Sequence, residues 1–192
     1  MSSYEEIIYS ENFKNWFGDW ENDPENASKV VDEEGKPLIM YHGSLADFDT
    51  FDISKTGKNW GGFSSHGRGI YFTGSSEAAE LWVRRGMGST QNFKGEPRVY
   101  PVFLNIRNPY TNDRLAKSYY NQGPRVWNIK NTAHSSFLDW GYDGFFGQCY
   151  GDYLAVATSP NQIKSVDNNG NFSLDSDNIY ERKLKHKRRL YF

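Results

Sequence analysis

Apolar residues occur along this chain in short runs that acidic or glycine-rich stretches separate, a pattern typical of many short strands. The runs at 29–31 and 37–41 flank the acidic turn 32–35 and predict a β-hairpin. Residues 98–106 are rich in Val, Tyr and Phe and predict a longer strand, in which Pro101 indicates a sheet edge or a bulge. Further strands are expected at 145–146 and 152–158.

Helical spacing occurs in fewer places. An aromatic-rich stretch at 12–20 predicts a short helix, which Asp23-Pro24 ends. After Ser75, apolar residues recur at helical spacing as far as Trp82, behind hydroxyl and acidic residues suited to an N-cap. A third helix is expected at 132–140. Many strands with a few separate helices indicate the α+β class.

The chain has 192 residues, and we expect a single domain over 1–192 with a substantial core. Aromatic residues make up 17% of it, so large rings should form much of the core, and they also suit a ligand cleft. The stretch 55–69 is too glycine-rich for the interior of an element and is expected to form a mobile loop over that cleft. Residues 181–192 form a basic tail, which is either a solvated end or an electrostatic contact with RNA or DNA.

The composition also bears on the compartment and on metals. No apolar run approaches the roughly 18 residues of a membrane span, and the acidic stretch 1–10 differs from a signal peptide. Cys149 is the single cysteine, so no internal disulfide forms and a reducing compartment is compatible. We therefore expect a soluble, cytoplasmic protein without a membrane partner. The four histidines show no H-E-x-x-H spacing and there is no C-x-x-C, so no metal is expected.

The most informative pattern is a His-Gly pair followed by a glycine-hinged aromatic strand. His42-Gly43 ends the apolar run at 37–41, and the segment GRGIYFT at 67–73 brings in Tyr71. Trp82 follows Tyr71 by eleven positions, inside the expected helix. These residues carry the main part of a resemblance to a known family.

Three further segments belong to the same pattern, namely FKNWFGDW at 13–20, GYDG at 141–144 and NQIKS at 161–165. Together they resemble ADP-ribosyltransferases of the His-Tyr-Glu type, which include diphtheria toxin and the poly(ADP-ribose) polymerases. The closest resemblance is to the ADP-ribosyltransferase modules of phage-borne polyvalent proteins, and it covers roughly residues 10–172.

The resemblance implies an ADP-ribosyltransferase-like α+β fold, with split, mainly antiparallel sheets around a cleft that binds NAD as co-substrate. It implies that His42 hydrogen-bonds a ribose hydroxyl and that the backbone of Gly43 pairs with the nicotinamide carboxamide, where any side chain would collide. Tyr71 and Trp82 would sandwich the nicotinamide, the alternative being that both are core aromatics. The implied NAD-binding set also includes Ser44, Gly69 and Phe72.

Gln162, in the NQIKS stretch, looks like the replacement for the family's third-position glutamate and would complete a catalytic triad with His42 and Tyr71. A glutamine keeps a hydrogen bond to the ribose but cannot act as a base, which favours transfer of a single ADP-ribose. Two departures from the relatives concern neighbouring contacts. Ala79 stands where the polymerases have a carboxamide-binding serine, and Pro160 disfavours arginine as the acceptor.

These observations predict a mono-ADP-ribosyltransferase that modifies a bacterial macromolecule, as an effector or toxin in the host cytoplasm if it is phage-derived. Protein is the favoured acceptor and nucleic acid its rival. An NAD glycohydrolase and a non-catalytic module that binds ADP-ribose or nucleic acid are the alternatives. Asp139, Asp143 and Asp152 could supply carboxylates for glycoside hydrolysis, although turn and capping roles explain them equally well. Arg68 and Lys164 could meet the pyrophosphate, although a surface position is the simpler expectation.

Overall fold

The fold is taken from a computed structural model, which describes residues 3–56, 69–89, 96–111, 141–149, 151–168 and 170–181. Three expected features lie outside the described residues. They are most of the glycine-rich loop, at 57–68, the helix expected at 132–140, and the basic tail from 182 onward.

The described strands form one seven-stranded sheet in the order β4-β5-β6-β2-β1-β3-β7. The strands are β1 (Met40–Ser44), β2 (Ile70–Thr73), β3 (Arg98–Leu104), β4 (Pro109–Tyr110), β5 (Gly144–Cys149), β6 (Asp152–Ala157) and β7 (Ile163–Ser165). All neighbours pair antiparallel except β4 and β5, which are parallel. The expected α+β class and the mainly antiparallel sheet are therefore confirmed.

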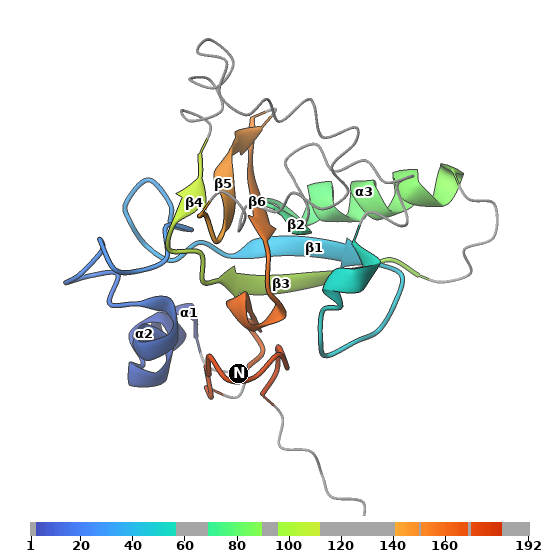
Figure 1. Ribbon diagram of the computed structural model, residues 1–192. Helices are drawn as coiled ribbons and strands as arrows, with labels where there is room; N and C mark the ends of the chain where they lie inside the picture. Colours follow the sequence, from blue (N-terminus) through green and yellow to red (C-terminus); the bar gives the residue numbers. More distant parts are fainter. Residues whose placement is uncertain are drawn as a thin grey trace, which may run out of the picture.

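The sheet is divided between β1 and β2. These two strands are joined by a single residue pair, Tyr41 with Thr73, whereas β1 pairs with β3 over five residues and β2 pairs with β6 over four. Figure 1 shows β4, β5 and β6 running across the direction of β1 and β3. The split expected of the fold is thus a narrow join between two differently oriented half-sheets.

The described helices are α1 (Tyr4–Ile8), α2 (Glu11–Phe17) and α3 (Ser76–Ser89), with 3-10 turns η1 (Ile53–Lys55) and η5 (Pro160–Gln162). Helix α2 ends earlier than expected because Gly18 has φ +103°, and any Cβ there would lie 2.3 Å from the Cα of Ala27. Helix α1 is not among the expected elements, although Ser3 and Glu6 form a capping box at its start. None of the described helices is long and apolar enough to cross a membrane.

Two clusters of apolar side chains make up most of the described core. The larger lies on the sheet and includes Met40, Phe72, Val102, Ile163 and Ile179. The second is aromatic: α1 and α2 bury Ile8, Phe13, Trp16 and Phe17 against Phe103 of β3 and Phe172. The N-terminal helices therefore share a core with the sheet, and large rings fill it as the composition predicts.

Pro101 is not at an edge of the sheet, because β3 lies between β1 and β7. The pairing of β7 with β3 runs only from Val102 to Leu104, so Pro101 lies beyond the paired residues of β7. Its carbonyl accepts a hydrogen bond from the Val166 N–H at 3.1 Å. The absent N–H of proline is tolerated here because no ladder bond from β7 requires it.

Candidate active site

His42 bridges the two half-sheets where the ladder between them stops. It follows Tyr41, the β1 residue of the joining pair, and its Nδ1 lies 2.8 Å from the main-chain oxygen of Tyr71 in β2. Aromatic rings surround the partly buried imidazole, with Phe51 edge-on at 5.0 Å and 85° and Phe72 tilted at 5.6 Å. The position of this ring is therefore set by a hydrogen bond on one side and by packing on the others.

The hydrogen bond to Tyr71 determines the tautomer of His42. A carbonyl oxygen only accepts hydrogen bonds, so Nδ1 carries a proton, and in the neutral imidazole Nε2 is then unprotonated. Burial lowers the pKa of His42 below its ordinary value of 6.5, and it outweighs the bond to the Tyr71 carbonyl, which raises the pKa. The neutral imidazole at pH 7 can accept a hydrogen bond from a hydroxyl group, as the proposed ribose contact requires.

We expect the free energy of unfolding to fall as the pH drops below about 6.5, because the unfolded chain binds a proton at His42 more readily than the folded one. The contribution of this residue changes by at most about 1.4 kcal/mol per pH unit, and it is fully present above that range. This contribution is measured by urea unfolding of the wild type and of His42→Asn at about pH 7.5 and about pH 5.5. The wild type should lose more stability than the variant, and an equal loss would contradict a lowered pKa.

The backbone of Gly43 faces the gap between the half-sheets. The carbonyl of Pro101 points away from β1 and accepts a hydrogen bond from Val166. Tyr41 pairs with Pro101, and its own backbone N–H and C=O therefore point toward β2. Because backbone direction alternates along a strand, the N–H and C=O of Gly43 also point to the β2 side. The described pairing with β2 has ended there, so no ladder bond to β2 occupies these groups, and their pairing with a carboxamide stays a prediction.

The packing of α3 against β1 requires a glycine at position 43. A Cβ at this position would lie 2.2 Å from the main-chain oxygen of Ala79 and 2.4 Å from Cγ2 of Val83, both in α3. The side chain that glycine lacks would therefore collide with the helix. The glycine lets α3 pack directly on β1, and this contact brings the helix to the edge of the gap.

Tyr71 and Phe72 point to opposite faces of β2, because successive strand residues alternate. Tyr71 is partly buried and packs with the cluster of Tyr110, Phe145 and Val156. Phe72 is fully buried in the main core, and its ring packs against the His42 ring. The ring of Phe72 therefore supports His42 from within the core, and a contact of Phe72 with NAD stays a prediction.

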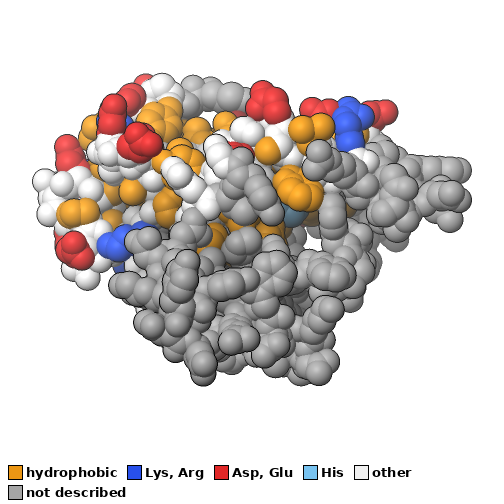
Figure 2. Space-filling view, turned by 90° about the horizontal axis from the view of Figure 1, so that it is seen from above, with side chains coloured by type: hydrophobic (Ala, Val, Ile, Leu, Met, Phe, Trp, Pro, Cys, Tyr) orange, Lys and Arg blue, Asp and Glu red, His pale blue; other side chains and the backbone are white. Residues whose placement is uncertain are grey.

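Trp82 is 45% exposed on α3, one turn after the buried Ala79 that lies against Gly43. The alternative that Trp82 is a core aromatic is therefore excluded. The space-filling view from above shows hydrophobic side chains reaching the surface across the described part of this face, with acidic side chains around its outer edge (Figure 2). The main-chain oxygen of Ala79 lies near Gly43, but an alanine has no hydroxyl with which to bind a carboxamide.

Two other residues of the expected NAD-binding set have structural roles. Ser44 ends β1, where its hydroxyl accepts a hydrogen bond from the N–H of Ala46 at 3.1 Å. A Cβ on Gly69 would lie 2.4 Å from Cγ1 of Val156 and 2.5 Å from the oxygen of Ala157, so this glycine allows β2 to approach β6. A direct contact of either residue with NAD stays a prediction.

The side chain of Gln162 is engaged by the backbone around it. Its Oε1 accepts from the N–H of Thr158 and of Ser159, both at 2.9 Å, and its Nε2 donates to the oxygen of Asp143 at 2.8 Å. Its own main-chain oxygen accepts from the N–H of Asn105 at 2.8 Å, beside β3. The amide thus ties the β6–β7 connection to the start of β5, which is a structural role, and its ribose contact stays a prediction.

The carboxylate of Asp152 lies beside the start of α3. Asp152 begins β6, and along that strand its side chain shares a face with Val156, the partner of Tyr71. Its carboxylate reaches the end of β2 and the start of α3, where Oδ2 lies 3.4 Å from the hydroxyl of Ser75. Asp152 therefore places a carboxylate at the helix that carries Ala79 and Trp82.

Asp143 has the turn role considered for it, because its carboxylate accepts from the N–H groups of Arg107 and Asn108 at 2.7 and 2.9 Å. Asp139, its suggested partner for glycoside hydrolysis, lies outside the described residues, as does Arg68. The structure describes the backbone of Cys149 but not its side chain. Within the described ranges, no group of three His, Cys, Asp or Glu side chains could hold a metal ion.

Lys164 is neither at a pyrophosphate nor on the surface. Its side chain is fully buried, and Nζ donates to the oxygens of Ser176 at 2.7 Å and Asn178 at 3.1 Å and pairs with the Glu181 carboxylate. The sequence gives no sign of this burial, because the partners lie 12 to 17 residues further along the chain.

The mainly antiparallel sheet, with its two half-sheets joined at one residue pair, is consistent with an ADP-ribosyltransferase-like fold. The model of the family described as ADP-ribosyltransferase in polyvalent proteins matches residues 32–172. The chain belongs to this family. No curated protein and no solved structure matches the chain. Helices α1 and α2 and the segment from 173 onward lie outside the matched span.

Proposed function

We propose that this chain is a mono-ADP-ribosyltransferase that transfers single ADP-ribose units from NAD to a bacterial protein in the cytoplasm. The observation that carries the proposal is the geometry of His42. Its imidazole is neutral, with Nδ1 committed to the Tyr71 carbonyl and Nε2 unprotonated, and it lies at the join of the half-sheets in a chain of this family.

The reaction breaks the bond between the nicotinamide nitrogen and C1′ of the ribose, and the electron pair goes to the nicotinamide ring. The acceptor then forms a bond to C1′ and releases a proton. Since positive charge develops on the ribose, a catalyst needs to orient the sugar and stabilise that charge more than it needs a strong base. His42 would orient the ribose by accepting a hydrogen bond at Nε2.

The residues near the join fit the nicotinamide half of NAD. Gly43 directs an N–H and a C=O toward the gap, the pair of groups that a carboxamide complements. Trp82 offers an exposed ring on α3, and Tyr71 lies in the adjoining strand. Stacking against a positively charged ring adds a cation-π contribution to the ordinary aromatic contact.

We propose that Asp152 supplies the negative charge that Gln162 lacks in place of the family's third-position glutamate. A carboxylate stabilises the positive transition state through its charge, whereas a neutral amide gives only a hydrogen bond. The support is the position of Asp152 beside Ser75 at the start of α3, together with the backbone hydrogen bonds that occupy Gln162.

The acceptor is tested with adenine-labelled NAD incubated with the protein and a bacterial lysate, followed by protease, RNase or DNase. Bound label that only protease removes supports a protein acceptor, and bound label that only a nuclease removes overturns it. An excess of free ADP-ribose over bound label would identify an NAD glycohydrolase, and binding without nicotinamide release would identify a non-catalytic module. The mass of the modified acceptor distinguishes one unit from a chain.

Replacing Trp82 by alanine should raise the KM for NAD about two- to tenfold, because one stacked ring contributes roughly 0.5 to 1.5 kcal/mol. The substitution should leave the unfolding temperature almost unchanged, since the side chain is 45% exposed. Leu81→Ala is the matched control, because Leu81 is the neighbouring helix residue and is 53% exposed. Equal KM values for the two variants would remove Trp82 from the site.

A further inference from the structure

Two of the aromatic rings around His42 come from outside the strands of the site. The segment 45–56, which follows β1, contributes Phe51 and Phe48. Phe51 is 4% exposed and meets the imidazole edge-on at 5.0 Å, and Phe48 lies at 6.5 Å from it. The two phenyl rings are 4.7 Å apart, so they form one support for the histidine.

The first anchor of this segment is Tyr100 of β3. Its ring stacks on Phe48 at 4.5 Å and 12°. Its hydroxyl accepts from the N–H of Phe48 at 3.2 Å and donates to the oxygen of Ala46 at 2.8 Å. One end of the segment is therefore fixed to the same strand that pairs with His42.

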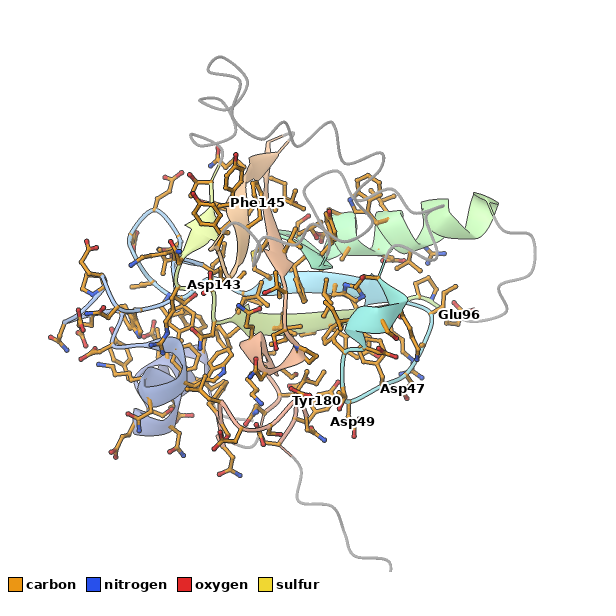
Figure 3. The ribbon with its side chains drawn as sticks, in the orientation of Figure 1. Asp47, Asp49, Glu96, Asp143, Phe145 and Tyr180 are labelled. Atoms are coloured by element: carbon orange, nitrogen blue, oxygen red, sulfur yellow. The ribbon has the colours of Figure 1, made fainter. Side chains whose placement is uncertain are left out.

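The second anchor is the C-terminal segment 176–181. The N–H of Ile179 donates to the oxygen of Asp49 at 2.8 Å, and Asn178 pairs with Thr50 and donates through Nδ2 to the Asp49 carboxylate at 3.2 Å. Ile179 is fully buried in the same cluster as Phe51. Figure 3 shows Asp49 and Tyr180, from distant parts of the sequence, side by side.

The segment 176–181 is in turn held on β7. The buried Lys164 donates to the oxygens of Ser176 and Asn178 and pairs with Glu181, and the N–H of Ser165 donates to the oxygen of Ile179 at 2.9 Å. A buried ammonium group must keep its partners, because an unpaired charge in the interior is very unfavourable. Lys164 therefore keeps the segment in one place beside segment 45–56.

We propose that segment 176–181 is a positioning element of the NAD site, which acts through Asp49 and Phe51 to hold the His42 ring against the Tyr71 carbonyl. The inference rests on the proposed function of His42. It gives a role to residues that lie beyond the span 32–172 matched by the family. Phe51 and Asn178 are positioning residues in this arrangement, since neither needs to touch NAD.

The buried Lys164 and the largely buried Glu181 of this arrangement pair with each other, and the charged groups of segment 45–56 and of Arg98 are exposed. Asp47, Asp49 and Asp52 lie on segment 45–56, and Arg98 of β3 lies 3.5 Å from the Asp47 carboxylate. The described hydrogen bond of the imidazole goes to the Tyr71 carbonyl and not to one of these groups. Loosening Phe51 should therefore raise the pKa of His42 toward 6.5, because water replaces the apolar ring.

The experiment compares Phe51→Leu and Asn178→Ala with the wild type in two measurements. ¹⁵N NMR of the histidine ring nitrogens, assigned with His42→Gln, gives the tautomer and pKa of His42 without any substrate. Nicotinamide release at saturating NAD gives the catalytic consequence, for which we expect a decrease on the order of tenfold. The control is Phe17→Leu, a fully buried ring of α2 in the other cluster, which should destabilise the fold and leave both measurements unchanged.

His42 nitrogens that titrate as in the wild type in both variants would overturn the proposal. Should Phe51→Leu fail to fold, Asn178→Ala decides, because it removes hydrogen bonds of a partly buried residue and no core ring. If Asn178 acts through the Phe51 ring, adding Asn178→Ala to Phe51→Leu should cause no further change in the His42 titration or in nicotinamide release. A wild type that releases no nicotinamide would refute the proposed function, while a shifted His42 pKa would still support the positioning.

Discussion

Replacing Asp152 by asparagine should reduce nicotinamide release from NAD by a factor on the order of 10² to 10³, with little change in the KM for NAD. The asparagine keeps the shape and the hydrogen bond to Ser75 but removes the negative charge. A charge that acts mainly on the transition state affects kcat more than binding. Initial rates of nicotinamide release at several NAD concentrations separate the two parameters.

The controls for this prediction are Asp152→Glu and Gln162→Glu. Asp152→Glu keeps the carboxylate and should retain much of the activity. Gln162→Glu replaces the amide donor that bonds the Asp143 oxygen, so it should cost roughly 1 to 3 kcal/mol of stability without a faster reaction. A faster Gln162→Glu enzyme together with a fully active Asp152→Asn enzyme would show that the negative charge acts at position 162 and not at Asp152.

Replacing His42 by alanine should reduce nicotinamide release on the order of 10²-fold or more, because the ribose loses the group that orients it. The bond across the join to the Tyr71 carbonyl is lost as well. His42→Asn is the matched variant, since its amide can still donate to that carbonyl while lacking an acceptor at the place of Nε2. Both variants should therefore be inactive, and the asparagine variant should be the more stable of the two.

Equal rates for His42→Ala and the wild type would remove His42 from the site. A loss of activity accompanied by unfolding of both variants would instead assign His42 to the join alone. Circular dichroism and thermal unfolding distinguish these outcomes from a loss of catalysis in a folded protein.

Most of the fold could be predicted from local patterns. The strands β3 and β6 and the start of α3 follow from β-branched and aromatic runs and from the N-cap at Ser75, whose hydroxyl accepts from the Ala78 N–H at 3.2 Å. Pairing partners cannot be read in this way. The internal position of Pro101 depends on β7, which contacts β3 only after the chain has passed through β4, β5 and β6.

The residues of the candidate site also fall into two groups, those that a local motif predicts and those whose position depends on strand pairing. His42, Gly43 and Tyr71 are recognisable because each belongs to a short motif within one strand. The position of Asp152 beside α3 could not be predicted, because it arises from the pairing of β6 with β2. The alternation of side chains along a strand already predicts that Phe72 and Tyr71 point to opposite faces of β2.

The central claim is that this chain cleaves the nicotinamide-ribose bond of NAD at His42. The most direct measurement is the release of nicotinamide from NAD labelled in the nicotinamide ring, by the wild type and by His42→Asn at equal concentrations of folded protein. The account predicts steady release by the wild type and, for the variant, a rate lower by about two orders of magnitude or more. Release by the wild type no faster than in buffer, or equal rates for the two proteins, would contradict it.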